Sequence, residues 1–248
     1  MGIGVERDRA EIRDRVLSAD ASESELLSRF TAHPLFASVE TLDSAAVVDV
    51  LLQRRFLSLL FPVVYDVGID GLTDPVAVRI VREILREEYP DATGATPSHR
   101  EDLVADLLVL GATREQILAS RPSAVTADVV QDTLALILDA AAAGGDLAVL
   151  TILRFWGEVL VSVEYGEFCR RMEPAFVAAQ TASRFYHPHL HHDGAEPLAL
   201  ATASSATHSG RLGACLAQLL SGDAAAEAFA RVEDRVLAGR LRFYDQFV

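Results

Sequence analysis

The sequence predicts an all-α protein with a single domain, built as a bundle of about eight or nine helices. Apolar residues recur at three- and four-residue spacing through most of the chain, which is the period of a helix buried on one side. Alanine and leucine dominate these segments, and no alternating β-branched stretch is bounded by hairpin turns. The 248 residues can bury a large core, and no linker, repeat or low-complexity block divides them.

Short breaks rich in glycine, proline, serine and aspartate separate the expected helices. We expect one domain over residues 1–248, with residues 1–27 forming a peripheral N-terminal helix. The expected helical segments are 5–18, 42–66, 74–89, 98–110, 126–143, 146–172, 174–193, 197–220 and 223–246.

Charge and composition argue against several classes of function. The net charge of −14 repels phosphate backbones, which disfavours nucleic-acid binding. The most apolar stretch, 147–163, carries Arg154 and Glu158 near its middle, so it predicts a buried helix of a soluble protein rather than a membrane span. The charged, periodic N-terminus lacks the apolar core of a signal peptide. With two cysteines only, a reducing cytoplasm is the simpler expectation.

Four of the seven histidines fall in residues 184–197, RFYHPHLHHDGAEP. On a helix, His189, Asp193 and Glu196 would share one face, because they stand at positions i, i+4 and i+7. His192 would lie close to that face, and the other two histidines would point elsewhere. Imidazole and carboxylate groups on successive turns suit iron, manganese or zinc. A hydrated helix end is the alternative, although the preceding aromatic pair indicates partial burial.

Three further residues stand where a charged or polar group is unexpected. Glu88 lies near the centre of the buried stripe of its helix, where an uncompensated carboxylate is costly. His99 opens the next helix, so a tight reversal would bring it beside Glu88. Glu158 belongs to a narrow polar stripe on an otherwise apolar helix. The alternatives are a solvated or capping Glu88, a surface His99, and an exposed pair between Glu158 and Arg154.

The order of these residues resembles that of the heme-oxygenase-like diiron oxidases and oxygenases. It reads Glu88, His99, Glu158 and then His189-x3-Asp193-x2-Glu196, with Phe-Tyr shortly before the histidine. The stretches FTAHPLFASVE and LLQRRFLSLLFPVVYDV are similar to the opening helices of that family. The resemblance covers about residues 28 to 220. It implies the heme-oxygenase-like (TenA-like) bundle, which is shared with TenA-type thiaminases, the pyrroloquinoline-quinone synthesis oxidase and heme oxygenase.

The resemblance also implies a site and an activity. The implied metal ligands and catalytic residues are Glu88, His99, Glu158, His189, Asp193 and Glu196. They would hold two non-heme iron ions, or manganese, with O2 as co-substrate. The family usually has a histidine where this chain has Glu196, so His192 and His208 are alternative last ligands. The implied reaction is hydroxylation, desaturation or carbon–carbon cleavage of a small amino-acid- or fatty-acid-like substrate in specialised metabolism, with Arg154 as a candidate clamp for its carboxylate.

Two other functions remain open on the sequence alone. A metal-free TenA-type hydrolase would need a cysteine nucleophile, for which Cys169 is a candidate without a supporting motif. A heme- or ligand-binding bundle would use one histidine. In either case we expect a small-molecule ligand rather than a nucleic acid or a membrane. An electron donor and a second copy of the chain are candidate partners.

Overall fold

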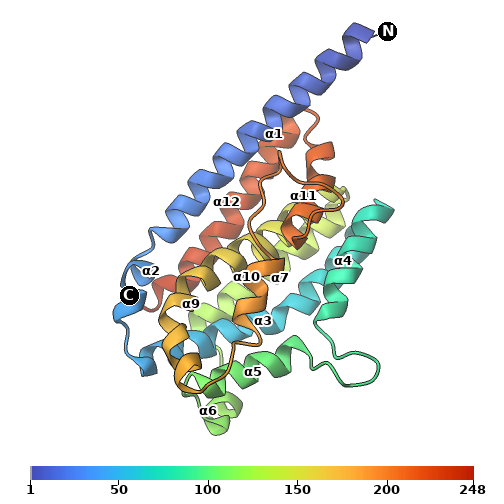
Figure 1. Cartoon of the computed structure of the whole chain (residues 1–248). Helices are drawn as coiled ribbons and strands as arrows, with labels where there is room; N and C mark the ends of the chain where they lie inside the picture. Colours follow the sequence, from blue (N-terminus) through green and yellow to red (C-terminus); the bar gives the residue numbers. More distant parts are fainter. Residues whose placement is uncertain (1) are drawn as a thin grey trace.

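The computed structural model describes the backbone of residues 2–248 and the side chains from residue 11 onward. Over this part of the chain it contains helices and loops and no strand, which confirms the all-α prediction (Figure 1). One continuous apolar core joins the helices into a single domain. The elements are α1 (Gly2–Thr31), α2 (Pro34–Ser38), η1 (Val39–Thr41), α3 (Ser44–Gly71), α4 (Pro75–Glu87), α5 (His99–Val109), α6 (Arg114–Ala119), α7 (Ala124–Ala143), α8 (Asp146–Ile152), η2 (Leu153–Val159), α9 (Leu160–Ala178), α10 (Tyr186–His192), α11 (His208–Leu219) and α12 (Asp223–Asp245).

The N-terminal helix extends further than the sequence predicts. The apolar period predicts helix over 5–18 and the expected peripheral helix covers 1–27, whereas α1 continues to Thr31 and lies beside α12 (Figure 1). The polar segment SADASESE hides the apolar period, which resumes at Leu26 and Phe30. Both side chains are buried, so the helix is held by its own apolar stripe against the bundle.

A continuous helical rod, 146–178, crosses the centre of the bundle. It consists of α8, the π-helix η2 and α9, and every residue of η2 is buried. The sequence predicts one helix ending at residue 172 and another beginning at residue 174, yet α9 continues without a break through Pro174 to Ala178. Burial of Met172 and Phe176 supports the last turns. The rod ends where Gln180 adopts a left-handed φ of 52°.

The segment after the rod contains less helix than expected. In place of helices over 174–193 and 197–220, the chain forms the short α10, a loop over 193–207, and α11. Asp106 of α5 anchors the start of α10. Its carboxylate accepts hydrogen bonds from Ser183 Oγ at 2.6 Å and from the backbone N–H of Phe185 at 2.9 Å. This contact fixes where α10 begins and therefore where its histidines lie.

The turn between α4 and α5 places two predicted site residues together. α4 ends at Glu87, and α5 begins at His99 behind a capping box in which Ser98 and Glu101 satisfy each other's backbone N–H groups. Glu88 and His99 therefore flank one loop and face the same end of the helix pair. No described helix is long and apolar enough to cross a membrane.

Candidate metal centre

Three of the predicted residues meet in one cluster, which we term the first triad: Glu88, His99 and His189. Their donor atoms lie within 4.8 Å of one another. His99 Nδ1 is 3.0 Å from Glu88 Oε1, and the two imidazole ring centres are 4.8 Å apart. His189 Nδ1 hydrogen-bonds to the carbonyl oxygen of Phe185. That bond fixes the ring and leaves Nε2 free, the arrangement usual for a metal-ligating histidine.

A second triad consists of Glu158, Asp193 and His208, whose donor atoms also lie within 4.8 Å of one another. His208 Nδ1 is 3.3 Å from Glu158 Oε2 and 3.5 Å from Asp193 Oδ1. The three side chains come from η2, the end of α10 and the start of α11. All three are buried, so their charges have little water to stabilise them.

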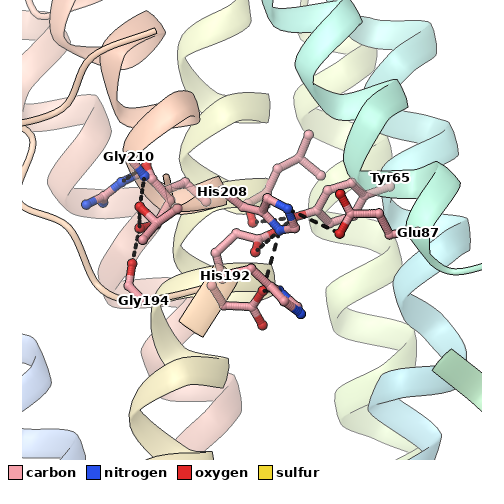
Figure 2. Close-up of polar contacts among 12 residues, drawn as sticks. Tyr65, Glu87, His192, Gly194, His208 and Gly210 are labelled. Atoms are coloured by element: carbon pink, nitrogen blue, oxygen red, sulfur yellow. Dashed lines mark hydrogen bonds and ion pairs between the residues drawn. The ribbon is translucent and has the colours of Figure 1, made fainter. Parts of the chain in front are cut away.

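His192 connects the two triads. Its ring centre is 4.9 Å from that of His189 and 5.1 Å from that of His208. Its Nδ1 is 2.7 Å from Asp193 Oδ1. Glu87, His192 and His208 form a further group of donors, and Figure 2 shows Glu87 and Tyr65 on one side of His208 and His192 on the other. The two triads therefore belong to one continuous cluster.

Glu196 lies outside both triads. Its carboxylate accepts hydrogen bonds from Ser205 Oγ and Thr207 Oγ1, each at 2.7 Å, and braces the loop before α11. The expected placement fails because α10 ends at His192, so the i+7 spacing no longer describes a helix face. His208, expected only as the last alternative, occupies the corresponding place in the second triad.

The π-helix brings Glu158 to the second triad. In this wider helix, Glu158 receives a hydrogen bond from the hydroxyl of Tyr65, which also contacts the Leu153 carbonyl oxygen at 3.2 Å. Gly157 makes room for that hydroxyl, because a Cβ at this position would lie 2.6 Å from it. Sequence reasoning missed this role of Tyr65, since a π-helix carries no recognisable pattern. Such helices occur frequently at functional sites.

The electrostatics of the second triad favour a cation. Burial, followed by repulsion from Asp193, raises the pKa of Glu158 to about 7. Burial would lower the pKa of His208, but the neighbouring carboxylates, Glu158 above all, raise it to about 12. In the first triad, burial lowers the pKa of His189 to about 4 and keeps the ring neutral. Mixed imidazole and carboxylate donors at these spacings fit first-row divalent metals.

A small cavity of about 20 Å³ adjoins the first triad. Glu88 and His189 form part of its wall. Most of the wall is apolar, and two arginines enter from another side. The remaining lining residues are Arg54, Leu57, Ser58, Phe61, Trp156, Gly157, Val161, Tyr165, Phe185 and Arg240.

Two solved structures share this architecture. One is a TenA homologue protein from P. horikoshii OT3, with a TM-score of 0.58 and 18% identity over 95% of this chain and 97% of that one. The other is a TenA family transcription regulator from Silicibacter sp. TM1040, with a TM-score of 0.61 and 14% identity over 94% of this chain and 96% of that one. The chain has a TenA-like fold. No family model and no curated protein matches the sequence.

Within this TenA-like fold, Arg154 has a structural position. Its guanidinium pairs with Glu23 of α1 and donates to the carbonyl oxygens of Glu196 at 2.7 Å and Ser209 at 3.1 Å. It therefore ties α1 and the loop before α11 to the rod. Among the described residues that line the cavity, the arginines are Arg54 and Arg240, so the expectation that Arg154 clamps a substrate was wrong.

The two cysteines of this TenA-like chain are both buried and free. Burial, with repulsion from Glu173 and Asp106, raises the pKa of Cys169 to about 12. Burial also raises the pKa of Cys215. Neither residue is among the described residues that line the cavity beside the first triad. A thiolate nucleophile is therefore poorly supported at either position.

Proposed function

We propose that the protein is a non-heme diiron oxidase or oxygenase that activates O2 and acts on a small organic molecule. The observation that carries the proposal is the pair of adjoining donor triads beside a small, largely apolar cavity. Glu88, His99 and His189 would hold one ion, and the second triad would hold the other. Two ferrous ions against three carboxylates leave about one net positive charge, which Glu87 or an anionic substrate can balance.

The chain's own residues would hold, orient and enclose the reactants. When bound, ferrous ions supply the electrons for O2 reduction during oxidation of the substrate. Phe185 fixes His189 through its carbonyl oxygen, and Tyr65 fixes Glu158 through its hydroxyl. The apolar wall limits water in the cavity and strengthens electrostatic interactions there. Because Glu88 and His189 belong to both the first triad and the cavity wall, a bound substrate would lie against that triad.

A metal-free hydrolase is less well supported. Such an enzyme would need an activated nucleophile beside its substrate. The cysteines carry raised pKa values and lie outside the cavity lining described above. The carboxylates and histidines instead face one another, an arrangement that bound divalent cations would stabilise.

Anaerobic loading with ferrous iron tests the proposal. We expect about two irons per chain by elemental analysis, a Mössbauer spectrum of high-spin ferrous ions, and consumption of O2 when air is admitted. His99→Ala and His189→Ala should lose iron and O2 consumption. His187→Ala and His191→Ala are matched controls, because these rings lie outside both triads. Less than one iron per chain in the unmodified protein, or equal loss in all four variants, would refute the proposal.

A further inference from the structure

Two buried arginines share a single buried carboxylate at the edge of the cavity. Arg54 of α3 and Arg240 of α12, termed here the arginine pair, both contact Glu164 of α9. Arg54 Nε lies 2.5 Å from Glu164 Oε1, and Arg240 Nη1 lies 2.6 Å from Glu164 Oε2. The exposed fractions are 4% for Arg54, 2% for Arg240 and 0% for Glu164. The three charged groups therefore interact almost without water.

The cluster of Arg54, Arg240 and Glu164 carries one net positive charge. Two guanidinium groups face one carboxylate, and Tyr244 adds a neutral hydroxyl that donates to Glu164 at 2.8 Å. Burial raises the pKa of Tyr165 to about 12, so this neighbour is also neutral. Glu88, a carboxylate that does line the cavity, is paired with His99. A buried charge without a counter-ion is expensive, which indicates that an anion completes this cluster.

The arginine pair also has hydrogen-bond donors to spare. Besides Glu164, Arg54 donates to Ser58 Oγ at 3.0 Å and Arg240 donates to the Trp156 carbonyl oxygen at 2.9 Å. Together with the three contacts to Glu164, these bonds use five of the ten N–H groups that two guanidinium groups offer. Planar guanidinium groups bind carboxylates with paired hydrogen bonds.

Arg54 and the first triad contact the same ring. The Arg54 guanidinium lies 5.2 Å from the centre of Tyr165, and the ring centre of His189 lies 5.8 Å from it. Both arginines and His189 also line the cavity, so a small molecule there can reach both groups. We infer that Arg54 and Arg240 bind the carboxylate of a very small monocarboxylic acid, of about the size of acetate. Treating this acid as the substrate rests on the proposed function, whereas the anion site itself does not.

Trp156 provides a direct measurement of binding, since it lines the cavity and is the only tryptophan in the sequence. The probes are acetate and its uncharged counterpart acetamide, titrated into the full chain while tryptophan fluorescence is recorded. We expect acetate to bind at least about tenfold more tightly, because only its charge completes the cluster. Equal affinities for the two probes, or no binding of either, would overturn the inference.

Variants of single arginines test which of these residues bind the carboxylate. Arg54→Gln and Arg240→Gln should each reduce the preference for acetate over acetamide to about twofold or less. Arg154→Gln is the control, because Arg154 is equally buried but lies outside the cavity lining described above, and it should keep the preference. Retention of the preference in both cavity variants would contradict the inference.

Ser58 offers a second test that leaves the arginine pair intact. Ser58→Asp places a carboxylate next to Arg54, where it should act as the missing counter-ion. We expect this variant to lose acetate binding and to melt at a higher temperature than Ser58→Asn, its uncharged counterpart. Undiminished acetate binding in Ser58→Asp relative to Ser58→Asn would overturn the inference.

Each titration is performed on metal-free protein and on protein loaded anaerobically with ferrous iron. The metal-free samples test the arginine pair alone, because no ion is present to bind the carboxylate. If iron fails to bind but metal-free protein still prefers acetate over acetamide, the proposed diiron function fails and the anion site stands. If iron binds and the preference is absent from both samples, the anion site fails and the diiron proposal stands.

Discussion

The hydroxyl of Tyr65 donates a hydrogen bond to the carboxylate of Glu158, joining α3 to the π-helix at the second triad. The contact is possible only because residue 157 is a glycine, whose missing side chain leaves space for the phenol. Tyr65 and Glu158 are both buried, so the hydrogen bond forms away from water and orients the carboxylate toward His208.

Gly157→Ala should disturb the second triad. The new Cβ would lie 2.6 Å from Tyr65 Oη and 3.2 Å from a ring carbon of Phe61, so the aromatic rings must move. We expect a loss of about 1–3 kcal/mol in the free energy of unfolding, together with weaker iron binding. Gly166→Ala, on the same rod, meets only an ordinary contact at 3.9 Å and should be neutral or stabilising. Denaturant titration and iron analysis measure both effects; equal behaviour of the two variants would contradict this account.

Replacing Glu196 and replacing His208 with alanine should have different effects on iron content and on melting temperature. His208→Ala should reduce bound iron by about one ion per chain, because it removes a donor of the second triad. Glu196→Ala should keep the iron and lower the melting temperature, because it leaves the hydroxyls of Ser205 and Thr207 without their acceptor. The measurement is iron stoichiometry alongside thermal unfolding. Loss of iron only in Glu196→Ala would restore that residue as the ligand.

Asp106 should affect iron binding at the first triad, because it fixes the start of α10. Asp106→Asn replaces an acceptor of N–H and O–H groups at the start of α10 with an amide, which supplies only one acceptor oxygen. We expect a loss of about 1–3 kcal/mol in stability and weaker iron binding through displacement of His189. Asp132→Asn, which breaks an exposed ion pair with Arg242, should cost less than about 1 kcal/mol. Unchanged iron affinity in Asp106→Asn would show that α10 is held by other contacts.

The thiol of Cys169 should react slowly at neutral pH. Burial raises its pKa to about 12, so the reactive thiolate is scarce at pH 7 and increases about tenfold for each pH unit up to that value. Alkylation of native protein by iodoacetamide, followed by mass spectrometry over pH 7–9, should show this rise, with rapid alkylation in urea as the control. Rapid, pH-independent labelling of the native thiol would revive a thiol-based hydrolase.

Helices that follow clear breaks in the sequence were predicted closely. The expected segments 74–89, 98–110 and 223–246 correspond to α4, α5 and α12 within two residues at each end. The apolar period predicted the wrong helix boundary where another interaction sets it. Burial carries α9 through Pro174, and hydrogen bonds to Asp106 set the start of α10. Neither cause can be recognised in a local window of sequence.

The candidate site was predictable where its residues flank a single short feature. Glu88 and His99 border one loop, and His189 and Asp193 are separated by one turn of helix. His208 belongs to the next helix, beyond a loop whose path depends on Arg154 and Glu196. The arginine pair joins residues 186 positions apart in sequence, Arg54 and Arg240, so only the fold reveals that they share Glu164.

The π-helix sets the angle, about the axis of the rod, between two sites along it. Glu158, in the π-helix, faces the second triad, and Glu164, in the α-helix that follows, faces the arginine pair. Deleting one residue from 153–159 would restore an ordinary helix and turn everything beyond it by about 100° about the rod axis. Either carboxylate could then face its partners, but not both. The extra residue in that turn therefore determines the angle between the metal site and the anion site. Evolution or design can alter this angle by adding or removing one residue, without changing the rest of the bundle.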